Sequence, residues 1–223
     1  MSLKSQPRLQ LLPPLTLPWH MKDVSTAKTR LENLPGGFKQ MIIQHELLRG
    51  VTPAMLVHWF THLLAGQLTI DGNHYPAYRV WHPNDHIAVN FTKSRSSDVP
   101  GCSPKAIIHI QECFGANPDY AVDNRMCVER IDEMGITLRA DILGVEYARL
   151  EHRFLEGLGG THYISQLRIG TMLPGISPFA RRQVERLMPD HKARAWFRHN
   201  VEEVGNFQFF LPEACARDPQ FCG

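Results

Sequence analysis

A chain of 223 residues can bury one sizeable hydrophobic core, and 43% hydrophobic with 21% charged residues is ordinary for a globular protein. The formal net charge of +2 is too small to argue for nucleic acid or a membrane surface as partner, and no apolar run approaches membrane-spanning length. Five widely spaced cysteines without a CxxC pair argue against a disulfide framework, so we expect a reduced, cytoplasmic protein. The sequence leaves the oligomeric state open, a homo-oligomer included.

The first fifty residues differ in character from the rest of the chain. Residues 1–50 are Pro-rich at first and are expected to form an N-terminal arm, with a short helix at 38–48 packed on a domain of residues 51–223. Thr52 and Pro53 form a good helix start, with Thr as N-cap and Pro at the first helical position. The apolar residues 54–64 that follow predict a largely buried helix.

From Tyr78 onward the pattern changes to short segments typical of strands. They are predicted around residues 78–81, 86–91, 105–114, 127–131, 136–141, 145–154 and 161–169, with several glycine-containing turns typical of an antiparallel meander. Helix resumes at Ser177 and Pro178 and runs, with a break at Pro189, to about residue 210. This order predicts an α+β fold in which a curved antiparallel sheet around a long C-terminal helix encloses a pocket.

Two segments far apart in the sequence carry metal-binding residue types. His199 and Glu203 lie four apart in the predicted last helix and therefore share one face. His82 and His86 flank a turn at Pro83, and Glu112 shares an apolar strand face with isoleucines, where a carboxylate is costly unless it is paired or bound to metal. A salt bridge to an arginine is the alternative for Glu112. Together, His86, Glu112, His199 and Glu203 would form a two-histidine, two-carboxylate site that suits zinc, with manganese or iron also compatible.

These residues resemble a known family. Tyr-Arg-Val-Trp-His-Pro-Asn-Asp-His at 78–86, a glutamate in a mid-chain strand and the late His-x-x-x-Glu before Phe210-Leu211-Pro212 are similar to the 2,4-diacetylphloroglucinol hydrolase family, which includes phloretin hydrolase. The resemblance covers roughly residues 52–212, in patches. It implies a helix-grip fold like that of the birch-pollen allergen and START domains, and zinc-dependent hydrolysis of a carbon–carbon bond in acylated phloroglucinols.

The resemblance also implies roles for individual residues. The four metal ligands would be His86, Glu112, His199 and Glu203, although an exchange of His82 and His86 stays open. Tyr78 would bind substrate, and Tyr78 and His82 are the candidates for proton transfer. Further substrate-binding candidates are Asn90, His152, Tyr163 and Tyr147; Asn90 is expected to share a strand face with His86 and Ala88.

The implied chemistry is a retro-Claisen hydrolysis. A zinc ion lowers the pKa of bound water and polarises a ketone, and a phloroglucinol ring or β-diketone can leave as an enolate. The substrate would be a small-molecule aryl ketone or polyketide. Two alternatives remain: a cyclase, isomerase or aldolase-like enzyme of polyketide secondary metabolism on the same fold, and a metal-free small-molecule-binding protein.

Overall fold

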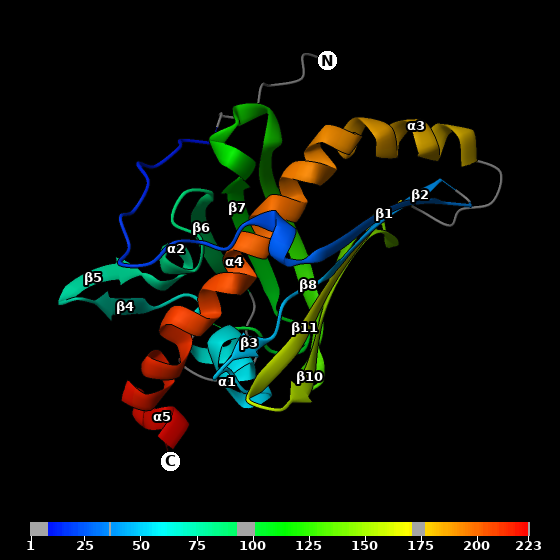
Figure 1. The fold of residues 1–223 in the computed structure, drawn as a ribbon. Helices are drawn as coiled ribbons and strands as arrows, with labels where there is room; N and C mark the ends of the chain where they lie inside the picture. The colour runs from blue at the N-terminus through cyan, green and yellow to red at the C-terminus, as the bar shows by residue number, and fades with distance from the viewer. Residues whose placement is uncertain (1–8, 36, 93–100, 171–176, 223) are drawn as a thin grey trace.

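One large sheet and one long helix make up most of the structure (Figure 1). The computed structural model describes residues 9–35, 37–92, 101–170 and 177–222. The strands are β1 Lys28–Leu34, β2 Phe38–Gln44, β3 Leu48–Arg49, β4 Gln67–Ile70, β5 Asn73–Pro76, β6 His86–Thr92, β7 Ile107–Cys113, β8 Ala121–Asp132, β9 Gly135–Ile142, β10 Val145–Gly157 and β11 Gly160–Ile169. The helices are η1 Val24–Thr26, α1 Pro53–His58, η2 Trp59–Leu63, α2 Ala77–Trp81, η3 Phe114–Ala116, η4 Pro118–Tyr120, α3 Ser177–Leu187, α4 Asp190–Arg217 and α5 Pro219–Cys222.

The large sheet has nine strands in the order β1-β2-β11-β10-β9-β8-β7-β6, with β3 added beside β11. The described pairings are antiparallel, and β6 to β11 follow one another as neighbours, which confirms the predicted meander. β8 begins at Ala121, before the predicted start at residue 127. β4 and β5 form a separate two-stranded hairpin.

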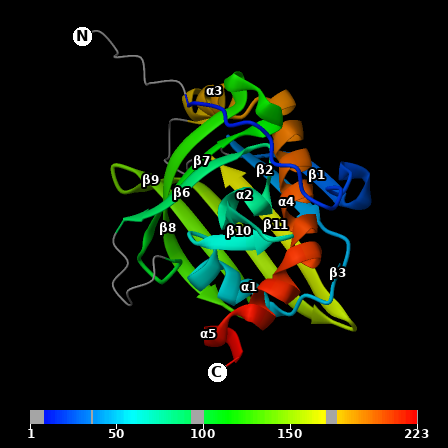
Figure 2. The same ribbon diagram turned by 90° about the vertical axis from the view of Figure 1, so that its left-hand side faces the viewer.

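The helix α4 lies across one face of the curved sheet, as Figures 1 and 2 show. It buries Val204 and Phe207 completely against the core. Trp59 of η2 packs edge-on against Phe207 and Phe210, with ring centroids 5.7 and 5.2 Å apart. This arrangement is the predicted helix-grip fold, because a sheet that curls around a helix buries both apolar faces and leaves room for a pocket between them.

The predicted helix starts at Thr52-Pro53 and Ser177-Pro178 and the break at Pro189 are confirmed, whereas α4 continues to Arg217, beyond the predicted end at about residue 210. The Thr52 side chain accepts a hydrogen bond from the Met55 backbone N–H, and Pro53 occupies the first turn of α1. The helical stretch continues through η2 to Leu63, close to the predicted end. At the C-terminal side, α3 ends before Pro189 and α4 begins directly after it, as expected of a proline that cannot extend a preceding helix.

The helix predicted at residues 38–48 is wrong, because β2 and β3 occupy this segment. Lys39, Met41 and Ile43 alternate with exposed or half-buried neighbours and point inward with 0% exposure. Lys39, a charged residue at one of these inward positions, interrupts the alternation of apolar and polar residues that would indicate a strand in the sequence. Its ammonium is neutralised by Glu185 and Asp190, whose carboxylate oxygens lie 3.1 and 2.8 Å away. β2 pairs with β11 of the main sheet, while the division of the chain at residue 50 stays a prediction.

The strand predicted at residues 78–81 is also wrong, because this segment forms the short helix α2. The preceding strand β5 pairs with β4 and not with the main sheet, so residues 77–81 have no strand neighbour to complete their hydrogen bonds. A helical turn satisfies them instead, and the His82 backbone N–H donates to the Tyr78 carbonyl.

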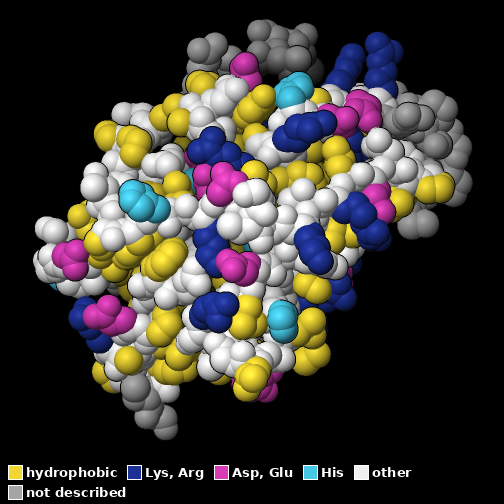
Figure 3. Space-filling model, in the orientation of Figure 1, with side chains coloured by type: hydrophobic (Ala, Val, Ile, Leu, Met, Phe, Trp, Pro, Cys, Tyr) yellow, Lys and Arg dark blue, Asp and Glu magenta, His cyan; other side chains and the backbone are white. Residues whose placement is uncertain are grey.

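The surface carries both signs of charge. On the face shown in Figure 3, Lys and Arg side chains lie interspersed with Asp and Glu. Among the described residues, no helix is long and apolar enough to cross a membrane.

Candidate metal centre

Three elements bring four buried side chains together. His86 begins β6 and pairs directly with Glu112 of β7 in the antiparallel register. His199 and Glu203 are one turn apart on α4, where the helix crosses this end of the sheet. All four residues are at most 8% exposed, so the site lies inside the protein.

The functional atoms of these four residues face one another. His86 Nε2 lies 3.3 Å from Glu203 Oε2 and 3.6 Å from Glu112 Oε1. His199 Nε2 lies 3.7 Å from Glu112 Oε2 and 3.7 Å from Glu203 Oε2. A single cation placed between these atoms could therefore take ligands from both histidines and both glutamates. Within the part of the chain that the structure describes, His86, Glu112 and His199 form one of two buried groups that could hold a metal ion.

The hydrogen bonds of the two imidazoles fix which nitrogen faces the site. His86 Nδ1 lies 2.7 Å from the Tyr78 carbonyl oxygen, which can only accept, so Nδ1 carries the proton. His199 Nδ1 likewise donates to Asp85 Oδ2 at 3.0 Å. Each Nε2 then faces the centre, and His86 Nε2 is buried without a hydrogen-bond partner among the described residues. Imidazoles oriented by a second acceptor in this way are typical of metal ligands.

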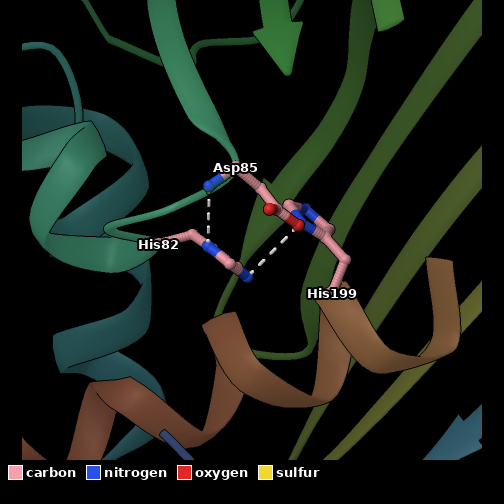
Figure 4. Close-up of side chains that lie close together, drawn as sticks. All are labelled: His82, Asp85 and His199. Carbon is pink, nitrogen blue, oxygen red and sulfur yellow. Dashed lines mark hydrogen bonds and ion pairs between the residues drawn. The ribbon is translucent and has the colours of Figure 1, made fainter. Parts of the chain in front are cut away.

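Asp85 connects α4 to the turn before β6 (Figure 4). Besides His199, it accepts hydrogen bonds from the backbone N–H groups of Gly115 and Ala116 at 3.0 and 3.3 Å. Burial opposes ionisation of this carboxyl, but the bond from His199, the nearby His82 and the Gly115 N–H outweigh it and lower the pKa of Asp85 to about 2. Asp85 is therefore an anion at neutral pH. Sequence reasoning did not identify it, although it lies within the Trp-His-Pro-Asn-Asp-His motif.

The second buried group with metal-binding geometry comprises His82, Asp85 and His199. His82 Nδ1 accepts the Asp85 backbone N–H at 3.1 Å, so Nε2 carries the proton and donates to Glu202 Oε2, also at 3.1 Å. Both nitrogens of His82 are thus engaged with protein groups, whereas His86 keeps a free lone pair. Between the two histidines, this geometry favours His86 as the metal ligand.

Tyr78 organises two of the four residues. Its carbonyl accepts from His86, its ring stacks on the His86 imidazole with centroids 3.8 Å apart, and its hydroxyl donates to Glu112 Oε1. Burial, together with the Glu112 and Glu203 carboxylates, raises the pKa of Tyr78 well above its usual value. The phenol therefore stays protonated and keeps its donor function.

The electrostatics of the centre favour a cation. Burial raises the pKa of Glu203, and the adjacent Glu112 adds to the effect. Burial alone would lower the pKa of His199, but the Glu203 carboxylate and the hydrogen bond to Asp85 outweigh burial and raise this pKa. Glu203 and His199 therefore both tend to keep a proton when no cation is bound, and a divalent ion would replace those protons.

A cavity of about 310 Å³ opens onto this centre. Its walls are mostly apolar, as expected of a ligand pocket, and they include the candidates Tyr78, Tyr147 and His152. Tyr163 is buried beside His152, with ring centroids 5.3 Å apart, but it is not part of the described lining.

Asn90 lies outside the cavity and is exposed. The expected face shared by His86, Ala88 and Asn90 is not formed, because a β-bulge lies between His86 and Ala88. A bulge shifts the alternation by one residue, so Val89 and not Asn90 follows His86 on the inner face, opposite Ile110.

No protein-family model and no curated protein match this sequence. Among solved structures, it is similar to a protein from Nitrosomonas europaea (11% identity, TM-score 0.46, covering 79% of this chain and 96% of that one). It is also similar to ginseng major latex-like protein 151 from Panax ginseng (8% identity, TM-score 0.43, 71% and 98%). A third is the di-domain ARO/CYC protein BexL from the BE-7585A biosynthetic pathway (14% identity, TM-score 0.40), of which this chain spans about half (76% and 51%). At identities of 8–14%, these similarities concern the fold alone.

Proposed function

We propose that this protein is a metal-dependent hydrolase that cleaves a carbon–carbon bond in an acylated phenolic or polyketide β-diketone. The observation that carries the proposal is the pair of imidazole Nε2 atoms of His86 and His199 facing two carboxylates beside an apolar cavity. The resemblance of residues 78–86 and of the His-x-x-x-Glu segment to the 2,4-diacetylphloroglucinol hydrolases supports the same reaction.

The ligand set fits zinc. His86, His199, Glu112 and Glu203 would hold the ion, and nitrogen and carboxylate oxygen ligands suit zinc in catalytic sites, while manganese(II) and iron(II) accept the same ligands. When bound, such an ion lowers the pKa of a coordinated water and polarises a carbonyl group. The orphaned Nε2 of buried His86 supports this assignment, because a buried imidazole lone pair without a partner is costly.

In the proposed reaction, a water oxygen bonds to the acyl carbon and the bond between that carbon and the ring breaks. The electron pair stays on the ring carbon as an enolate, which then takes up a proton. Tyr78 lines the cavity with a protonated hydroxyl and is the candidate for orienting the substrate or transferring this proton. His82 donates to Glu202 and is not among the described lining residues, so its proposed role is to support the centre.

His152 offers a second polar group in the cavity wall. Burial lowers its pKa to about 3, so its imidazole is neutral at pH 7. Its Nδ1 lies 3.1 Å from Ser165 Oγ. A neutral imidazole held in this way can hydrogen-bond a ring oxygen of the substrate without adding charge to the cavity.

The test combines metal analysis with product analysis. The purified protein should hold about one divalent ion per chain, and His199→Ala and Glu203→Gln should lose it while His74→Ala, an exposed hairpin variant, keeps it. Wild-type protein incubated with acylphloroglucinols or aromatic β-diketones should release a carboxylic acid. Metal with a cyclised or isomerised product instead of a free acid would point to the alternative chemistry. Ligand binding without metal or turnover would make the protein a carrier and end the proposal.

A further inference from the structure

Lys192 places a positive charge in the cavity wall. It is the only lysine or arginine among the described lining residues. The cavity-lining residues of α4 recur at helical spacing, namely Lys192, Trp196, His199, Asn200 and Glu203. Residues seven apart on a helix share a face and are separated by about 10 Å along its axis. Lys192 therefore lies about two turns from His199 on the same cavity-facing stripe.

The Lys192 ammonium has few protein groups near it that could neutralise its charge or accept its hydrogen bonds. Its Nζ lies 3.4 Å from the Ala121 carbonyl oxygen, at the long limit of a hydrogen bond, and among the described residues no carboxylate lies within ion-pair distance of it. The cavity carboxylate of Asp123 is engaged by His109 and Gln111 instead. Burial lowers the pKa of Lys192, as expected of a half-buried cation that lacks a counter-ion.

When a metal ion is bound at the centre, the carboxylates around the ion would no longer be available to neutralise the charge of Lys192. A divalent ion carries two positive charges, which Glu112 and Glu203 would neutralise. Two charged residues of the described lining then remain, and the Asp123 carboxylate is already engaged by His109 and Gln111, so Lys192 is the charged group left to bind an anion on the ligand. An anionic group on the ligand would gain a charge-assisted hydrogen bond there, in a partly desolvated setting where such bonds are strong.

We propose that Lys192, two turns before His199 on α4, forms an anion subsite that binds a carboxylate of the substrate. The inference rests on the proposed function for placing the reacting ketone near His86 and His199. The hydroxyl groups of the substrate that neighbour its acyl group stay close to the reacting carbon. They cannot reach Lys192 from a ketone bound near His199, two helical turns away. A distal phenol is largely neutral at pH 7, with a reference pKa of about 10, whereas a carboxylic acid is ionised. The substrate class is thus an aryl ketone with a carboxylate on a distant ring or chain.

The test uses two matched ligands on the protein as purified. One is a biphenyl with a para acetyl group on one ring and a para carboxylate on the other, and the second is the same ketone with a carboxamide in place of the carboxylate. Neither is a β-diketone, so both bind without turnover, and calorimetry gives their affinities. Wild-type protein should bind the carboxylate about tenfold more tightly, the effect of one hydrogen bond to a charged group.

The variants decide whether Lys192 is responsible for this preference. Lys192→Met should abolish the preference by weakening carboxylate binding more than carboxamide binding, and the carboxamide binding that remains shows that the cavity is intact. Lys192→Arg should retain it, as should Lys28→Met, which removes an exposed lysine of β1. Equal affinities in the wild type, or a preference that survives in Lys192→Met, would overturn the inference. If the protein releases a carboxylic acid from its substrates but does not prefer the carboxylate ligand, only the inference about Lys192 is refuted. If it prefers the carboxylate ligand but binds no metal or hydrolyses no substrate, only the proposed function is refuted.

Discussion

The Nδ1–H of His199 donates to Oδ2 of Asp85 over 3.0 Å, and this bond joins the long helix to the turn before β6 (Figure 4). The two residues are 114 positions apart in the sequence. Asp85 is fixed in turn by the Gly115 and Ala116 backbone N–H groups, so the orientation of the His199 ring depends on three separate segments. The bond sets the tautomer that leaves His199 Nε2 free to bind metal.

Asp85→Asn should weaken metal binding without removing any proposed ligand. The variant loses the negative charge that holds the His199 proton on Nδ1, and loss of such an outer partner typically costs 10–100-fold in metal affinity or activity. Competition with a chromophoric chelator measures the affinity. Asp141→Asn, an exposed change on β9, is the matched control and should behave like wild type. Wild-type affinity in Asp85→Asn would show that the bond does not support a metal site.

Tyr78→Phe should reduce turnover while the metal stays bound. The change removes the hydroxyl that donates to Glu112 but keeps the carbonyl and ring contacts to His86. Proton transfer or orientation by one side chain typically contributes about 10²–10⁴-fold, so kcat should fall at least about 100-fold. Steady-state kinetics with parallel metal analysis measures both effects. Tyr75→Phe, which alters a half-buried tyrosine of the β4–β5 hairpin outside the described cavity lining, should keep most of the activity. Equal losses in the two variants would contradict a special role for Tyr78.

His152 should make the protein less stable in mild acid. Burial lowers the pKa of His152 to about 3, and the side chain is 3% exposed. An unfolded histidine titrates near 6.5. Between these two values the unfolded chain binds a proton that the folded chain does not, so the free energy of unfolding falls as the pH drops through this window.

Urea unfolding at several pH values measures this dependence. His152→Gln has no titrating ring, so its free energy of unfolding should fall less steeply below about pH 6.5. His74→Gln removes an exposed histidine and should retain the wild-type slope. Parallel slopes for wild type and His152→Gln would show that the folded protein accepts a proton at this position.

Part of the fold could be predicted because its pattern is local. The strands of residues 86–169 alternate with period two between glycine-containing turns, and Thr52-Pro53 is a complete helix start in itself. β2 escaped prediction because Lys39 occupies an inward position, and only Glu185 and Asp190, far along the chain, make that burial acceptable. The bulge after His86 has no signature in the sequence, which is why Asn90 was expected on the wrong face.

The candidate site was predictable in its residue types but not in its hydrogen bonds. Spacing placed His199 and Glu203 on one helix face, and the resemblance to a hydrolase family brought His86 and Glu112 to the same centre. The orienting roles of Asp85 and of the Tyr78 carbonyl depend on backbone positions in three segments, and residue types do not reveal these. The structure also separates His86, with its free Nε2, from His82, whose two nitrogens are engaged.

Anomalous X-ray diffraction at the zinc absorption edge, from crystals grown with zinc, tests the central claim most directly. We predict one strong peak per chain, within about 2.0–2.3 Å of Nε2 of His86, Nε2 of His199 and at least one oxygen from Glu112 or Glu203. A peak bound by His82 and Asp85 instead, or no peak in this buried cluster, would contradict the account.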